Sequence, residues 1–192
     1  MATLLLPPRS GNASRSRVLA VLLTVLLALA MTLIDATPSQ ATVYNRRLRN
    51  LTTDKCLDIP GTDAPTMGTS VIQYLCGPWA AQRWDFVDGV EGFLIKNTLN
   101  PDLCLDAPGT DAPRKATVGF YPCQDTTADN QLWTQEWNST GTAFLVVNVK
   151  SKRAGRPACL DVAGMREIDN FLRIGVYPCT TSLDDDHYWW FD

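Results

Sequence analysis

The chain has 192 residues, of which 45% are hydrophobic, and a formal net charge of −3. This length accommodates one domain with a core of its own. With 17 basic and 20 acidic residues scattered along it, the chain lacks the electrostatic footprint of a protein that binds nucleic acid or an anionic membrane surface.

The first 41 residues differ from the rest of the chain. Three arginines, Arg9, Arg15 and Arg17, precede an apolar run over residues 18–34, and small residues end at Ala41. This order predicts a secretory signal peptide, residues 1–41, cleaved after Ala41. A 17-residue run is at the short limit of a membrane span, so an uncleaved signal-anchor that attaches the protein to a membrane is the alternative. Either interpretation predicts export, and secretion follows from the first.

The remaining part, 42–192, contains one pattern three times. The segment 56–65 recurs as 104–113 with nine of ten positions identical, and a shorter copy occupies 159–164. Each copy continues with a second cysteine, and a tyrosine stands two residues before it. A tryptophan then follows in each copy, within Gln82-Arg83-Trp84, Gln131-Leu132-Trp133 and His187-Tyr188-Trp189. We therefore predict one domain with repeats over about 44–92, 93–142 and 143–192.

All six cysteines lie in these repeats. In each repeat 18 or 19 residues separate the two cysteines, which favours the pairs Cys56–Cys76, Cys104–Cys123 and Cys159–Cys179. An even cysteine count in an exported chain is typical of disulfides. Zinc is disfavoured because there is no C-x-x-C and His187 is the single histidine. We expect no metal and no cofactor.

Short β-rich runs between Pro, Gly and Asp turns predict an all-β fold. In the middle repeat these runs are 92–97, 103–107, 116–121 and 132–137, so that three repeats give about twelve strands. Three-fold repetition needs closure, because open strand edges invite aggregation. The spacing from Cys56 to Cys104 is 48 residues and that from Cys104 to Cys159 is 55, so seven additional residues are expected near 138–141 or 151–157.

The ordered set of Cys-Leu-Asp, an aromatic before the second cysteine and a closing Gln-x-Trp resembles the ricin-B lectin family over roughly residues 44–192. The resemblance implies a β-trefoil with three internal repeats and one disulfide in each. It also implies that the Gln-x-Trp residues form the structural core; these are Gln82, Trp84, Gln131, Trp133 and Trp189. Members of the family bind galactose-type or other neutral sugars in a shallow pocket on each repeat.

A pocket for a neutral sugar needs a carboxylate for vicinal hydroxyls, an amide and an aromatic platform. The residues that the resemblance assigns to carbohydrate binding are Asp58 and Tyr74; Asp106, Tyr121 and Asn130; and Asp161, Tyr177 and Asp186. Only the middle set is complete, because Ala81 and Asp186 stand at the amide position of the other repeats. The alternative for each aspartate is a local turn role. The run 184–186 also reads as a solvated loop.

Three functions follow in order of preference. The first is a non-catalytic lectin that binds a glycan or polysaccharide, with any enzyme or toxin subunit as a separate partner. The second is a trefoil that has lost sugar binding and acts as an inhibitor or interaction protein. It gains support from Ile72, Gly119 and Gly175, which stand where the family often has a glutamine. Catalysis is disfavoured because every polar feature is triplicated, whereas a catalytic set is needed once.

Overall fold

The structure is a computed structural model that describes residues 42–109 and 111–192. The predicted signal peptide and its cleavage point lie outside the described residues. Within the part described, no helix is long and apolar enough to cross a membrane.

Each repeat contributes four or five short strands. The first repeat contains β1 (Val43–Arg46), β2 (Leu48–Asn50), β3 (Cys56–Asp58), β4 (Ile72–Tyr74), the 3-10 turn η1 (Ala80–Gln82) and β5 (Trp84–Asp88). The second contains β6 (Phe93–Asn97), β7 (Asn100–Asp106), β8 (Ala116–Thr117), β9 (Gly119–Pro122) and β10 (Leu132–Trp137). The third contains β11 (Phe144–Asn148), the short helix α2 (Val149–Arg153), β12 (Ala158–Val162), β13 (Ile174–Pro178) and β14 (Tyr188–Phe191).

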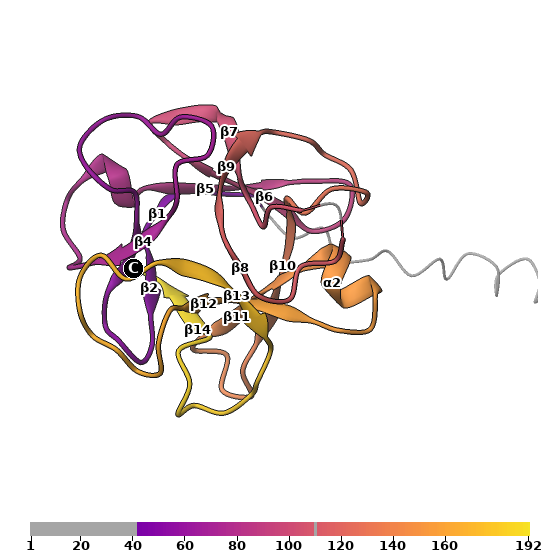
Figure 1. The fold of residues 1–192 in the computed structure, drawn as a ribbon. Coiled ribbons are helices and arrows are strands. Elements are labelled where there is room, and N and C mark those ends of the chain that lie inside the picture. Colours follow the sequence, from indigo (N-terminus) through magenta and orange to yellow (C-terminus); the bar gives the residue numbers. More distant parts are fainter. Residues whose placement is uncertain (1–41, 110) are drawn as a thin grey trace, which may run out of the picture. The chain divides into compact units, whose positions relative to one another are not determined.

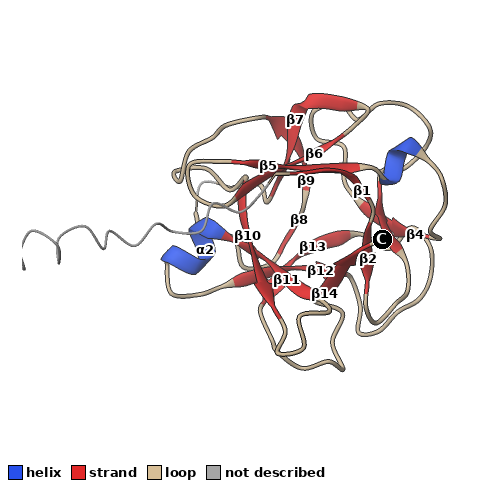
Figure 2. Cartoon of the chain, turned by 180° about the vertical axis from the view of Figure 1, so that it is seen from behind, coloured by secondary structure: helices blue, strands red, loops and turns tan. Residues whose placement is uncertain are grey.

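Six strand positions close into a barrel. β5 pairs with β6, β6 with β10, β10 with β11, and β11 with β14, all antiparallel. β14 then pairs with β2, and β1, one residue before β2 in the chain, pairs back with β5. The ring of strands is visible in Figure 2. Closure satisfies the backbone groups that an open sheet edge would expose.

Three hairpins are attached to this barrel, one in each repeat. They are β3–β4, the end of β7 with β9, and β12–β13. Figure 1 shows them distributed around the barrel. The predicted β-trefoil is therefore confirmed.

The described residues contain fourteen strands rather than about twelve. The additional strands arise where one extended segment is shared between two partners. β1 pairs with β5 whereas β2 pairs with β14, and the break falls at Arg47. β8 pairs with β13 of the third repeat whereas β9 pairs with β7, and the break falls at Val118. The short helix α2, capped by Asn148, lies in the longer spacing between Cys104 and Cys159 and overlaps the second of the two segments expected to hold the additional residues.

The core lies inside the barrel and beneath the hairpins. Trp84, Trp133 and Trp189 are completely buried. Their indole nitrogens donate to the carbonyl oxygens of the three leucines in the Cys-Leu-Asp segments, at 3.0, 3.0 and 3.1 Å. Each tryptophan thus fixes the strand that carries the aspartate of the same repeat, and satisfies its own buried donor.

The predicted disulfides are present in the structure. They join Cys56 to Cys76, Cys104 to Cys123, and Cys159 to Cys179. Each bridge connects the first strand of a hairpin to the residues just after its second strand. The aspartate and the tyrosine of a repeat therefore lie on two strands that a covalent bond holds together.

Candidate functional site

Each hairpin places its aspartate and its tyrosine on one face. Asp58 lies opposite Ile72, and Tyr74 is two residues further along the partner strand. Side chains two residues apart on a strand point to the same side, so the carboxylate and the ring are diagonal neighbours. The same register relates Asp106 to Tyr121 and Asp161 to Tyr177. The pairing of these side chains is thus repeated three times.

The glutamine of each Gln-x-Trp segment orients the carboxylate. Gln82 Nε2 donates to Asp58 Oδ2 at 2.7 Å and to the Leu75 carbonyl at 2.8 Å, while its Oε1 accepts from the Gly77 amide at 2.8 Å. Both Gln82 and Asp58 are buried. The glutamine is therefore the residue that fixes the carboxylate relative to the segment after the second cysteine.

The second repeat repeats this arrangement. Gln131 Nε2 donates to Asp106 Oδ2 at 2.9 Å and to the Pro122 carbonyl at 3.1 Å, and its Oε1 accepts from the Gln124 amide at 2.8 Å. Burial raises the pKa of Asp58 and of Asp106, and the glutamine hydrogen bond opposes that rise in both.

Asn130, predicted to be the amide of the middle site, is buried rather than open. Its Nδ2 donates to the carbonyl of Gly109 at 2.5 Å and of Asp111 at 3.2 Å. Its Oδ1 is buried and has no hydrogen-bond partner among the described residues. The amide nitrogen thus supports the loop after Asp106, and only the oxygen is left to receive a hydroxyl. Tyr121 is half-buried beside it.

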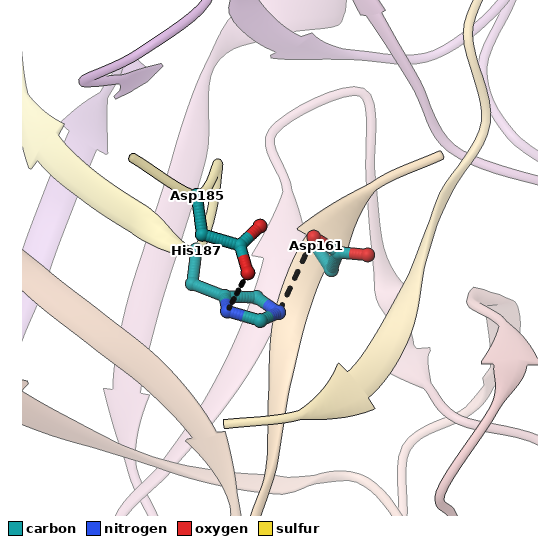
Figure 3. A group of neighbouring side chains, drawn as sticks. All are labelled: Asp161, Asp185 and His187. Carbon is teal, nitrogen blue, oxygen red and sulfur yellow. Dashed lines mark ion pairs between the residues drawn. The ribbon is translucent and has the colours of Figure 1, made fainter. Parts of the chain in front are cut away.

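The third repeat replaces the glutamine with His187, which is fully buried. Its Nε2 lies 3.3 Å from Asp161 Oδ1, and its Nδ1 lies 3.6 Å from Asp185 Oδ2. Figure 3 shows the two carboxylates at opposite edges of the imidazole ring. Burial lowers the pKa of His187, against the opposing charges of Asp185 and Asp186. A neutral ring therefore occupies the position of the glutamine.

Asp186 is buried, so the interpretation of 184–186 as a solvated loop is wrong at this residue. The pKa of Asp161 is raised to about 9, first by burial and then by a hydrogen bond with Asp186 and the negative charges of Asp186 and Asp185. Burial raises the pKa of Asp186 as well. At neutral pH the pair holds one proton between two carboxylates.

This pair predicts a pH-dependent stability. The folded pKa of Asp161 lies above the value near 4 of an unfolded aspartate, so its contribution is complete below about pH 4 and is lost as pH rises towards 9. We expect Asp161→Asn to raise the melting temperature at pH 8 by about 2–6 °C and to flatten its decline between pH 7 and 9. Calorimetric scans at several pH values measure both effects.

Asp184→Asn is the matched control for this prediction, because Asp184 is exposed on the same loop. It should leave the profile of melting temperature against pH unchanged. Between pH 7 and 9 His187 stays neutral, since burial lowers its pKa, and so it does not contribute to the slope. An Asp161→Asn profile parallel to that of the unmodified protein would contradict the shared proton.

Asp161, Asp185 and His187 are also the group of described residues whose ligand atoms come within 4.8 Å of one another, as a metal site requires. The two carboxylates lie against different ring nitrogens, however, rather than on one side of the ring. A neutral ring carries a single N–H, and neither ring nitrogen makes a hydrogen bond to a described residue, so the two carboxylates lie near the imidazole without both accepting from it.

Two clefts open beside these groups. The first cleft, of about 300 Å³, lies in the first repeat and is lined by Asp58, Tyr74 and Ala81, with Trp79 and Phe171 on its walls. The other cleft, of about 480 Å³, lies in the third repeat and is lined by Asp161, Tyr177 and Asp185, with Lys115 and Arg173. Both volumes fall in the range of small-molecule sites, at about 300–1,000 Å³.

Residues that one repeat contributes to the site of another were not predicted from the sequence. Lys115, from the second repeat, places its Nζ 4.6 Å from the centre of the Tyr177 ring. Phe171, from the third repeat, lies 4.9 Å from the Tyr74 ring. Neither residue belongs to a motif, and their positions depend on how the repeats pack.

Three asparagines at strand ends were also missed. Asn50, Asn97 and Asn148 donate from Nδ2 to the carbonyl oxygens of Asp186, Ala81 and Asn130, at 2.6, 2.9 and 2.9 Å. Each asparagine therefore holds the backbone of the residue that directly precedes the Gln-x-Trp segment of another repeat, or that precedes His187 in the third repeat. The sequence carries only a partial signal, since Asn50, Asn97 and Asn148 stand 6, 7 and 11 residues before the cysteine of a Cys-Leu-Asp segment.

A family model described as the ricin-type beta-trefoil lectin domain matches residues 91–192, just over half of the chain. No match was found among curated proteins.

Solved structures with the same fold include ThreeFoil, a designed three-fold symmetric protein (TM-score 0.64, 20% identity, 76% of this chain and 96% of that chain). The hemolytic lectin CEL-III is also similar (TM-score 0.59, 27% identity, 77% of this chain and 30% of that chain). A third is the ricin B-like lectin of Macrolepiota procera in complex with lactose (TM-score 0.60, 16% identity, 81% and 97%).

Proposed function

Because the chain belongs to the ricin-type β-trefoil lectin family, we propose that it is a non-catalytic carbohydrate-binding protein for neutral sugars of the galactose type or for a neutral polysaccharide. One observation carries the proposal. An oriented aspartate and a tyrosine recur in the same register on all three hairpins, covalently held by a disulfide in each. A carboxylate for hydroxyl groups and an aromatic face for the C–H side of a sugar are the elements that such recognition needs.

The second repeat is the leading candidate for the sugar site. Asp106 is oriented by Gln131 and retains the half-buried ring of Tyr121 beside it. The Macrolepiota procera lectin, with the same fold, was solved with lactose bound. The third repeat differs, because Asp161 shares a proton with Asp186 and Lys115 lies over the ring of Tyr177. We therefore expect unequal affinities in the three repeats.

The binding energy of one shallow site is expected to be small. A dissociation constant near 1 mM corresponds to about −4 kcal/mol. Several sites on one trefoil raise the avidity for a repetitive glycan without any new contact. Export, with removal of residues 1–41 after Ala41, completes the proposal, and three disulfides are typical of proteins that fold outside the cytoplasm.

The test is calorimetric titration of the disulfide-bonded protein with galactose, lactose and xylan fragments. We expect Asp106→Asn to weaken lactose binding at least ten-fold, because the ionised acceptor for vicinal hydroxyls is lost while Gln131 keeps an oxygen to donate to. Asp102→Asn, an exposed aspartate on the same strand, is the matched control and should bind as the unmodified protein does.

Two outcomes would contradict the proposal. One is an absence of binding across a broad panel of neutral glycans by a protein whose fold is intact. The other is equal lactose binding by the Asp106→Asn and Asp102→Asn variants. The first outcome would favour the interaction or inhibitor function that the missing amide at Ala81 and the glycines at 119 and 175 suggest.

A further inference from the structure

The loop that joins the two strands of each hairpin contacts the hairpin of a neighbouring repeat. Bridges join Ser70 to Gly119, Thr117 to Gly175, and Arg173 to Ile72, and each of these partners stands opposite the aspartate of its own repeat. The residues two positions before Ser70, Thr117 and Arg173 are Gly68, Lys115 and Phe171, respectively. These three residues therefore occupy equivalent positions at the second, third and first hairpins.

Phe171 gives the first cleft an additional aromatic wall. Its ring centre lies 4.9 Å from that of Tyr74, and the Trp79 ring lies 5.8 Å from Tyr74 on a second side. All three side chains line the cleft, and the rings of Phe171 and Trp79 are largely open to solvent, with 63% and 45% of each residue exposed. The cleft thus presents several aromatic faces to one ligand.

Both outer rings are held in place at a structural cost. Phe171 has a φ of +66°, a left-handed conformation that is unfavourable for a bulky residue, and its amide donates to the Gln73 carbonyl at 2.9 Å. The Trp79 ring packs onto Gly77, where a Cβ atom would approach it to 2.5 Å. At the second hairpin the equivalent of Phe171 is Gly68, which meets no such steric difficulty.

Asp58 is the acidic residue that lines the first cleft. It is 5% exposed, and burial raises its pKa against the hydrogen bonds from Gln82 and the Ile59 amide. None of the described side chains that line the cleft is basic. Ala81 and Ile72 stand where side-chain amides would donate to a sugar. The negative charge of a largely buried carboxylate is costly, and a cationic ligand beside it would offset that cost.

We propose that the first cleft is a binding site for an organic ammonium ion, which packs against the aromatic side chains of Tyr74, Trp79 and Phe171 that line the cleft, with its charge near Asp58. Aromatic faces attract such cations through their negative quadrupole, most strongly when the cation is partly removed from water. The ammonium group can belong to a trimethylammonium headgroup or to a protonated amino sugar. The first cleft holds the Asp58 and Tyr74 pair of the first repeat, so the proposal assigns one of the three hairpin sites a charged ligand, while the second repeat remains the site proposed for a neutral sugar.

The test compares choline with 3,3-dimethylbutan-1-ol, in which an uncharged carbon replaces the ammonium nitrogen. Titrations of the full disulfide-bonded chain, followed by tryptophan fluorescence and by calorimetry, should give at least ten-fold tighter binding of choline. Glucosamine and N-acetylglucosamine form the second arm, since only the former carries a charged amine. Tighter binding of choline or of glucosamine than of its uncharged counterpart supports the site and identifies the source of the ammonium group.

Two variants locate the site. Phe171→Gly places at this position the residue found at the equivalent Gly68, and it suits the left-handed backbone, so the fold is retained. The Phe171→Gly variant and the Asp58→Asn variant should each weaken binding of the ammonium ligand at least ten-fold. Asp106→Asn, the same change in the second repeat, should leave it unaltered.

Equal binding of the charged and uncharged members of both pairs would overturn the proposal, as would an Asp58→Asn variant with unchanged affinity. Displacement of choline by lactose at similar concentrations would show that the first cleft is a neutral-sugar site. Because lactose binding is tested separately at Asp106, the two proposals can fail independently.

Discussion

Replacing Trp133 with alanine is expected to lower the free energy of unfolding by about 3–5 kcal/mol. The side chain is completely buried in the core, and its indole nitrogen donates to the Leu105 carbonyl at 3.0 Å. Truncation leaves a large cavity together with an unsatisfied buried carbonyl, so two penalties add. Urea unfolding followed by fluorescence measures the change.

Trp137 supplies the matched control in the same strand, β10. It is 53% exposed and contacts Phe144 at a ring-centre distance of 4.8 Å. We expect Trp137→Ala to cost less than about 1.5 kcal/mol, since only this edge contact is lost. Equal destabilisation by the two substitutions would contradict the assignment of the Gln-x-Trp tryptophan to the core.

Removal of the disulfide between Cys104 and Cys123 by a double substitution to alanine is expected to cost about 3 kcal/mol. The loop that it closes spans 19 residues, and restriction of such a loop in the unfolded chain gives a contribution of this size. The hairpin that carries Asp106 and Tyr121 should also open more readily. Equilibrium unfolding measures the first effect, and hydrogen exchange of the β7 and β9 amides measures the second.

Reduction of the unmodified protein is the wider comparison. Loss of all three bridges should be more destabilising than loss of one, because each closes a separate loop of 19 or 20 residues. Reduction that leaves the free energy of unfolding unchanged would show that the core alone stabilises this trefoil.

The repeated pattern in the sequence was sufficient to predict a closed all-β fold of three repeats and the disulfides, whereas the β-trefoil itself was implied by the resemblance to the ricin-B lectin family. A unit with one cysteine pair, short strands and a recurring tryptophan favours closure, since each copy must bury the same apolar face. The register of Asp106 with Gly119 and Tyr121 is likewise local to one hairpin. The juxtaposition of carboxylate and ring was therefore predictable from spacing.

The protonation and burial of the third repeat were not predictable from spacing. Asp186 looks like one member of an acidic run, yet the chain turns its side chain inward, and the Arg166 amide donates to its Oδ2 at 3.1 Å. The raised pKa of Asp161 depends on this packing, because desolvation and the neighbouring carboxylate exist only in the folded state. His187 likewise meets Asp161 through a tertiary contact, whereas Asp185 lies two residues before it in the chain.

By itself the sequence determined the number of repeats, the cysteine pairs and the residues that each hairpin presents on its own face, because these features arise from contacts within one repeat. Only the tertiary structure decided what faces each tyrosine. Gly68, Lys115 and Phe171 lie outside the repeated motifs, and closure of the barrel brings each loop onto the hairpin of another repeat. The difference between the clefts of the first and third repeats is thus a consequence of contacts between repeats, which no local pattern records.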